Sequence, residues 1–189
     1  MPRDYAAQPP NRVRRHDRAI EDDAWIRDFL RTAPSGSLAT AHDGQPFINT
    51  NLFVYDETTN AIYMHTARVG RTRANVMADE RVCFSVSRMG RFLPADTAFE
   101  FSVEYAGVVV FGRAHIVADT AEAACALQML LDKYAPHLQP SVDYRPATAK
   151  ELGRTSVYKI EIDRWSGKMK KADADFPGAF YFADGSGRQ

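Results

Sequence analysis

Three arginines crowd one stretch of this chain, at the point where an expected strand leads into an expected short helix. Arg68, Arg71 and Arg73 surround Gly70 within residues 62–75. Positive charges at the start of a helix oppose its dipole by about 0.3–1 kcal/mol each, so helix energetics alone would not favour them there. A bound phosphate or carboxylate would remove that cost, because guanidinium groups and the free N–H groups of a first helical turn both hold anions. A solvated basic turn paired with acidic side chains elsewhere is the alternative, and the residues alone leave both interpretations open.

Two asparagines lie in the middle of an expected strand, where asparagine is uncommon. Asn49 and Asn51 share one side of residues 45–55, and Thr50 lies between them on the other side. Their amides could hydrogen-bond a planar heterocycle laid along the strand. They could equally point into water on a half-solvated sheet face.

Two further side chains stand at strand ends. His65 lacks the sequence context of a hydrolase nucleophile or of a metalloprotease, so we expect ligand contact or hydrogen bonding from it, not catalysis. No other residue is a convincing acid–base catalyst, and none of the histidines is spaced for a metal site. Trp165 could plug the core or an interface, or stack on a ring system.

Composition narrows the class of protein. A chain of 189 residues with 45% hydrophobic residues can build one full core, which favours a single domain. The 24 Lys and Arg balance the 24 Asp and Glu, and no standard nucleic-acid motif is present, so no nucleic-acid partner is expected. No apolar run is long enough for a membrane span or a secretion signal. With two cysteines expected to be reduced, the predicted location is cytoplasmic.

The periodicity of the apolar residues predicts a mainly β chain with peripheral helices. Three successive strands joined by tight turns predict an antiparallel meander. Six or so strands in total predict a closed or partly closed antiparallel barrel. The expected strands are 37–41, 45–55, 61–66, 81–87, 101–117 and 155–164, with a loop at 89–99. The expected helices are one from 21–23 to Pro34, one at 71–78, one from Asp119 to Pro136, and a turn at 148–152.

Several short motifs then follow one another in a recognisable order. They are Gly-Ser-Leu-Ala-Thr at 36–40, Gly-Gln-Pro-Phe at 44–47, Ile-Tyr-Met-His-Thr-Ala at 62–67 followed by Gly70-Arg71, Val-Val-Val-Phe-Gly-Arg-Ala at 108–114, and 160–168 ending in Ser-Gly-Lys. This order resembles the pyridoxamine 5′-phosphate oxidase-like superfamily of FMN-binding split barrels, and within it the branch of nitroimidazole-resistance reductase-like proteins. The resemblance spans about residues 20–170.

The resemblance implies a homodimer of antiparallel six-stranded split barrels with FMN at the subunit interface. The barrel domain would span residues 20–171, between a flexible arm at 1–19 and a tail at 172–189. The implied function is an FMN-dependent oxidoreductase that carries hydride or electrons to a small molecule, with NAD(P)H as a transient donor. The alternative is a non-catalytic flavin or haem carrier or sensor, in which His65 would be the axial haem ligand. The cofactor-binding residues implied are Asn49, Thr50, Asn51, His65, Thr66, Ala67, Arg68, Arg71, Thr72 and Trp165, the last reaching a flavin of the other subunit.

Two departures from the superfamily limit what the resemblance implies. Gly107 stands where relatives usually carry a Ser or Gln that helps to hold the flavin from the second subunit. The Arg-rich set near the C-terminus that binds pyridoxal phosphate in true pyridoxamine 5′-phosphate oxidases is not matched. Oxidation of vitamin B6 is therefore not expected.

Overall fold

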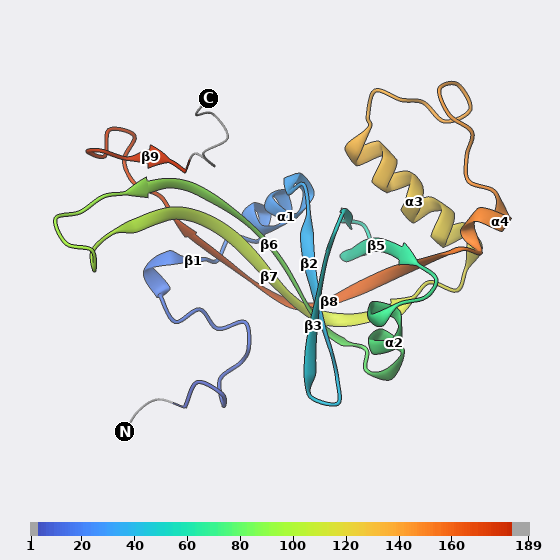
Figure 1. Ribbon diagram of the computed structural model, residues 1–189, viewed down its shortest axis with the longest axis horizontal. Helices are drawn as coiled ribbons and strands as arrows, with labels where there is room; N and C mark the ends of the chain where they lie inside the picture. The colour runs from blue at the N-terminus through green and yellow to red at the C-terminus, as the bar shows by residue number, and fades with distance from the viewer. Residues whose placement is uncertain (1–3, 183–189) are drawn as a thin grey trace, which may run out of the picture.

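One antiparallel sheet carries most of the chain. The computed structural model describes residues 4–182, and within them the strand order is β3-β2-β6-β7-β8-β5-β4, with β1 added to β8 and β9 to β6. Figure 1 shows β6, β7 and β8 running through the molecule, with α2, α3 and α4 at one end and β9 at the other. The strands are β1 (Ala19–Ile20), β2 (Gly36–His42), β3 (Gln45–Asn51), β4 (Phe53–Asp56), β5 (Ala61–Ala67), β6 (Arg81–Leu93), β7 (Ser102–Ile116), β8 (Thr155–Lys170) and β9 (Phe180–Tyr181).

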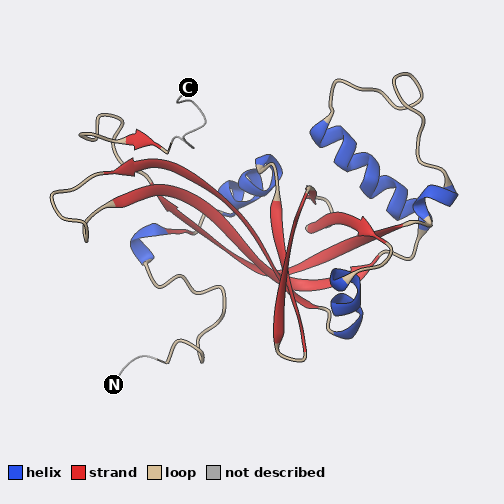
Figure 2. Cartoon of the chain, viewed as in Figure 1, coloured by secondary structure: helices blue, strands red, loops and turns tan. Residues whose placement is uncertain are grey.

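The helices lie around this sheet, as Figure 2 shows. They are α1 (Asp23–Thr32), α2 (Arg71–Ala78), α3 (Thr120–Tyr134) and α4 (Ala149–Leu152), preceded by a 3-10 turn at His16–Arg18. Because β3 and β4 end the strand order without pairing, the barrel is open. The prediction of a mainly β, antiparallel split barrel with peripheral helices is confirmed. Across residues 4–182, every helix is too short or too polar to cross a bilayer.

The expected meander is wrong, because the strand predicted at 45–55 breaks at the exposed Leu52. β3 pairs with β2, whereas β4 pairs with β5 at the other end of the strand order. At the break, the Tyr134 hydroxyl from α3 lies 3.1 Å from Phe53 N and 3.0 Å from Phe53 O. A side chain from a distant helix thus satisfies the backbone of the first residue of β4, which strand periodicity cannot reveal.

The larger of two apolar clusters lies on one face of this sheet, and a smaller one lies under α3 on the other face. The centre of the larger cluster holds Phe53 and Phe84, whose rings meet edge to face at 4.9 Å, and the fully buried Tyr158. The apolar stripe of α1, which includes Ile26 and Leu30, packs on it. Burying large apolar side chains contributes roughly 1.5–3 kcal/mol each, so this cluster fixes the positions of the strands that carry the candidate site.

A largely buried ion pair lies where β6 continues into the predicted loop, and it holds the segment after β8. Arg91 and Glu104 lie 2.8 Å apart on paired strands, with side chains only 16% and 13% exposed. Arg91 also donates to the carbonyls of Asp173 and Ala174, and Glu104 accepts from the N–H of Ala172. The predicted loop at 89–99 is therefore wrong over its first half, since β6 continues to Leu93.

Replacing Glu104 by glutamine is expected to release this segment. The Arg91 guanidinium, together with the Ala172 N–H, lowers the pKa of Glu104 from 4.5 to about 2. A lowered pKa means that the stabilisation is complete above pH 4.5 and is lost as the pH falls towards 2. The gap between the melting temperatures of the wild type and of Glu104→Gln should close over that range.

Limited proteolysis at neutral pH checks the same contact, because cleavage after Lys171 should be faster in Glu104→Gln. The matched control is Asp28→Asn, which removes an exposed pair with Arg31 on α1. Equal cleavage rates for the two variants would contradict the anchoring role.

The chain before α1 lies along β8. β1 pairs with β8 at Ala19 and Ile20, and the Asn11 amide donates to the carbonyl of Trp165 at 3.4 Å. The arm and tail expected from the sequence also include residues 1–3 and 183–189, which lie outside the described residues.

Candidate functional site

Helix α2 begins without a side-chain cap. Its N-cap is Gly70, with φ of 145° and ψ of 172°, a conformation that residues other than glycine rarely adopt. The first helical hydrogen bond runs from Ala74 N to Gly70 O, so the N–H groups of the first turn before it have no helical acceptor. This start of α2 can therefore accept an anion.

Two polar contacts fix α2 against the β2–β3 hairpin. Asn49 Nδ2 donates to Oγ1 of the buried Thr72 at 3.1 Å. One turn further on, Asn75 Nδ2 donates to Oγ1 of the buried Thr40 at 3.0 Å. The Asn75 Oδ1 atom is buried without a hydrogen-bond partner. Asn49 is thus oriented by the helix, beside the uncapped turn.

The neighbours of Asn49 on β3 are more open. The Thr50 hydroxyl lies 2.7 Å from that of Ser37 on β2, and both face solvent. Asn51 is half-buried at the end of the strand, opposite Gly36. β3 is an edge strand, so its outer backbone groups have no strand partner within the described chain.

The end of β5 brings a second set of predicted residues to α2. His65 is exposed, but neighbouring atoms partly desolvate its imidazolium and lower its pKa. The Thr66 hydroxyl lies 3.0 Å from that of Tyr158. Ala67 ends the strand and is exposed. Among residues 4–182, no group of three or more His, Cys, Asp or Glu could hold a metal ion.

The three arginines do not act as one cluster. Arg71 is exposed at the first position of α2. Arg68 donates to the carbonyl of Gly153, and Arg73 Nη1 donates to Ser156 Oγ at 2.8 Å. Within the described part of the chain, none of the three lies within 4.0 Å of a carboxylate. Of the three, Arg71 is left at the uncapped helix start without a carboxylate partner among residues 4–182, which favours a bound anion there.

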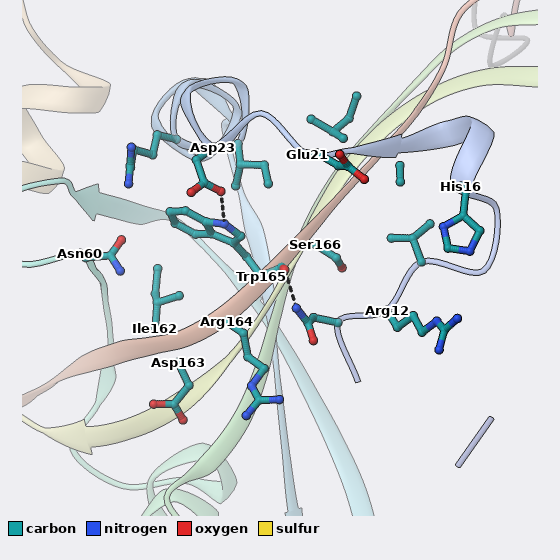
Figure 3. Close-up of a pocket in the computed structure, with 16 residues that line it drawn as sticks. Arg12, His16, Glu21, Asp23, Asn60, Ile162, Asp163, Arg164, Trp165 and Ser166 are labelled. Carbon is teal, nitrogen blue, oxygen red and sulfur yellow. Dashed lines mark hydrogen bonds between the residues drawn. The ribbon is translucent and has the colours of Figure 1, made fainter. Parts of the chain in front are cut away.

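Trp165 lies away from these residues. It stands nine positions after Ser156 on β8, which is up to about 30 Å at ~3.3 Å per residue. Its Nε1 donates to Asp23 Oδ1 at 2.7 Å, and the Arg27 guanidinium lies 5.5 Å from its ring. Figure 3 shows the ring beneath the start of α1, beside a cavity of about 630 Å³. Trp165 is thus held at the start of α1 and not at the start of α2.

One contact at α2 was missed by sequence reasoning. Asn75 was not singled out from the sequence, although it places α2 against β2. Asparagine is a poor helix former, so Asn75 inside an expected helix was an available signal. Its partner Thr40 is 35 positions away and could not be identified from the sequence.

Comparison with known proteins gives the family and the fold. The model of the family described as pyridoxamine 5′-phosphate oxidase matches residues 22–169. The flavocytochrome Anf3 from Azotobacter vinelandii is 25% identical, with a TM-score of 0.77 over 86% of this chain and 74% of that chain. The FAD and haem binding protein from Mycobacterium smegmatis is 24% identical, with a TM-score of 0.73 over 84% and 77%.

A candidate 5-nitroimidazole antibiotic resistance protein from Bacteroides thetaiotaomicron is 18% identical, with a TM-score of 0.66 over 80% of this chain and 86% of that chain. The sequence identities of 18% to this protein and 24% to the mycobacterial protein are low, so these two similarities show the fold alone. No protein of curated function matches the chain.

Proposed function

The chain belongs to the pyridoxamine 5′-phosphate oxidase family, and on that premise we propose that it is a flavin-binding oxidoreductase that passes hydride or electrons to a small molecule. The observation that carries the proposal is the uncapped start of α2, where Arg71 has no carboxylate partner among residues 4–182 and Asn49 is held beside Thr72. The flavin, when bound, supplies the redox chemistry. NAD(P)H is the proposed transient donor, and vitamin B6 itself is not the proposed substrate.

The residues at this site fit a flavin phosphate. Free N–H groups and the Arg71 guanidinium at the start of α2 are donors that suit a phosphate. Asn49, Thr50 and Asn51 on the open edge strand β3 would lie along the ring system, and His65, Thr66 and Ala67 would border the ribityl chain. The sequence predicts FMN, and FAD contains the same ribityl phosphate. The mycobacterial protein is described as binding FAD, which supports testing both flavins.

A homodimer is part of the proposal because of where Trp165 lies. Within one chain this tryptophan contacts Asp23 at the start of α1, whereas a second copy could place its Trp165 against the ring system of the first. The edge strand β3 exposes Phe47 and Ile48, which suits a contact between subunits. The cytoplasmic location predicted from the sequence also remains part of this proposal.

Haem binding is a second candidate, favoured by a specific observation. Two of the solved structures are described as a flavocytochrome and as a FAD and haem binding protein. His65 is exposed, and its lowered pKa favours the neutral imidazole, which is the form in which a histidine can ligate iron. In this version the protein would be a carrier or sensor.

Absorbance of the purified protein tests both candidates. We expect two visible flavin bands, or their appearance on titration with FMN or FAD, and bleaching by NADH or NADPH without oxygen. A Soret band that is lost in His65→Ala would support the haem candidate. A colourless protein that takes up neither flavin would contradict the oxidoreductase proposal. If flavin binds but neither NADH nor NADPH reduces it, the protein is a flavin carrier and not the proposed oxidoreductase. Light scattering during gel filtration checks for the dimer.

A further inference from the structure

A second cavity adjoins the arginine-bearing turn and has no role in the site described above. It has a volume of about 470 Å³ and lies between α2, the starts of α3 and β8, and α4. Figure 1 shows these elements gathered at the same end of the molecule. Much of its wall is apolar, formed by Ile116, Val117, Ala123, Leu152 and Val157. A cavity of this size and lining is within the range of small-molecule sites, roughly 300–1,000 Å³.

The charged residues of this cavity favour an anion. Arg68 and Arg73 line it, and within the described residues their side chains bond to uncharged groups alone, the carbonyl of Gly153 and the hydroxyl of Ser156. A guanidinium has five N–H donors, so most of theirs stay free. Asp119 also lines the cavity, but its carboxylate caps α3 by accepting from Glu122 N at 2.7 Å. The two guanidinium groups and the single Asp119 carboxylate together give the cavity a net positive charge.

The cavity and the flavin-phosphate site share one turn of the chain. Arg71 and Arg73 both lie in the first turn of α2, and side chains two positions apart on a helix point to different sides. Arg73 is held towards β8 by Ser156, whereas Thr72 is held towards β3 by Asn49. The start of α2 can therefore carry one phosphate beside Arg71 and a second beside Arg73.

We propose that this cavity binds an adenosine 5′-phosphate group, with the phosphate held by Arg68 and Arg73 and the base against the apolar wall. The shared turn favours FAD as the source of this group. In FAD the flavin phosphate and the adenylate phosphate are directly linked, so they could lie beside Arg71 and Arg73. The choice of FAD as the source rests on the proposed flavin function. A separate nicotinamide dinucleotide carries the same group, and the experiment distinguishes the two sources.

Titrations of the full-length protein with FMN, FAD, AMP and NADPH test the proposal. If FAD is the source, it should bind the wild type about 10- to 100-fold more tightly than FMN does. Arg73→Ala should remove this difference and leave the FMN dissociation constant unchanged. For a separate dinucleotide, FMN and FAD should bind alike, whereas NADPH should bind the FMN-loaded protein and lose affinity in Arg73→Ala. Equal binding of the two flavins, with no saturable binding of AMP or NADPH, would overturn the proposal.

Two further variants keep the test independent of folding. Ala149→Trp adds bulk at an exposed position that lines the cavity, so it should cause the same selective loss without removing a charge. Arg31→Ala removes an exposed arginine on α1 and should change no affinity. Unchanged affinities in both Arg73→Ala and Ala149→Trp would remove the cavity from nucleotide binding. If neither flavin binds but AMP does, the flavin function fails while the cavity assignment stands.

Discussion

Replacing Arg71 by alanine is expected to weaken flavin binding by about 1.5–3 kcal/mol, or roughly 10- to 150-fold in the dissociation constant. The guanidinium lies at the uncapped start of α2, and none of its atoms is within 4.0 Å of a carboxylate in the described chain. A phosphate bound there would take its charge-assisted hydrogen bonds from this side chain. Because Arg71 is exposed, its removal should leave the fold and its stability almost unchanged.

Fluorescence titration with FMN measures this loss, and Arg71→Lys refines its cause. Lysine keeps the charge but lacks the planar fork, so it should restore part of the affinity. Arg31→Ala on α1 is the control for loss of an exposed positive charge. An unchanged dissociation constant in Arg71→Ala would exclude Arg71 from the site. An equal loss of FMN affinity in Arg73→Ala would contradict the division of the arginines between two sites.

Local signals in the sequence predicted most of the elements around this site. The bounds of α2 match the expected 71–78, because Gly70 supplies the bend that begins the helix. The β2–β3 hairpin follows from its turn at 42–44, where Asp43 and Gly44 both have positive φ. The family resemblance is confirmed by the match over residues 22–169. The local sequence is sufficient to predict an element whose bounds depend on its own residues.

The failures share a different cause, which is contact between distant parts of the chain. The break at Leu52 depends on Tyr134, 81 positions after Phe53. The extension of β6 depends on Arg91 binding carbonyls beyond residue 170. The arginines looked like one cluster in sequence, but Ser156 draws Arg73 towards a separate cavity. No local pattern carries this information.

Replacing Gly112 by alanine is expected to lower the free energy of unfolding by about 2–4 kcal/mol. Gly112 is buried in β7 directly after a bulge in its pairing with β8. An added Cβ would lie 2.0 Å from the carbonyl oxygen of Glu161 on β8. That oxygen belongs to a backbone paired on both sides, with β7 and with β5, so it cannot withdraw without breaking strand hydrogen bonds.

Urea denaturation measures this effect, and Gly153→Ala is the matched control. Gly153 has helical φ and ψ of −62° and −12°, and an added Cβ there would lie 3.4 Å from its nearest neighbour. The control should therefore stay within about 0.5 kcal/mol of the wild type, or gain slightly from a less flexible unfolded chain. Equal midpoints for Gly112→Ala and the wild type would mean that β7 and β8 can separate locally at little cost. Because β8 carries both Ser156 and Trp165, the expected distortion of the β7–β8 pair should also weaken flavin binding, although Gly112 contacts neither site.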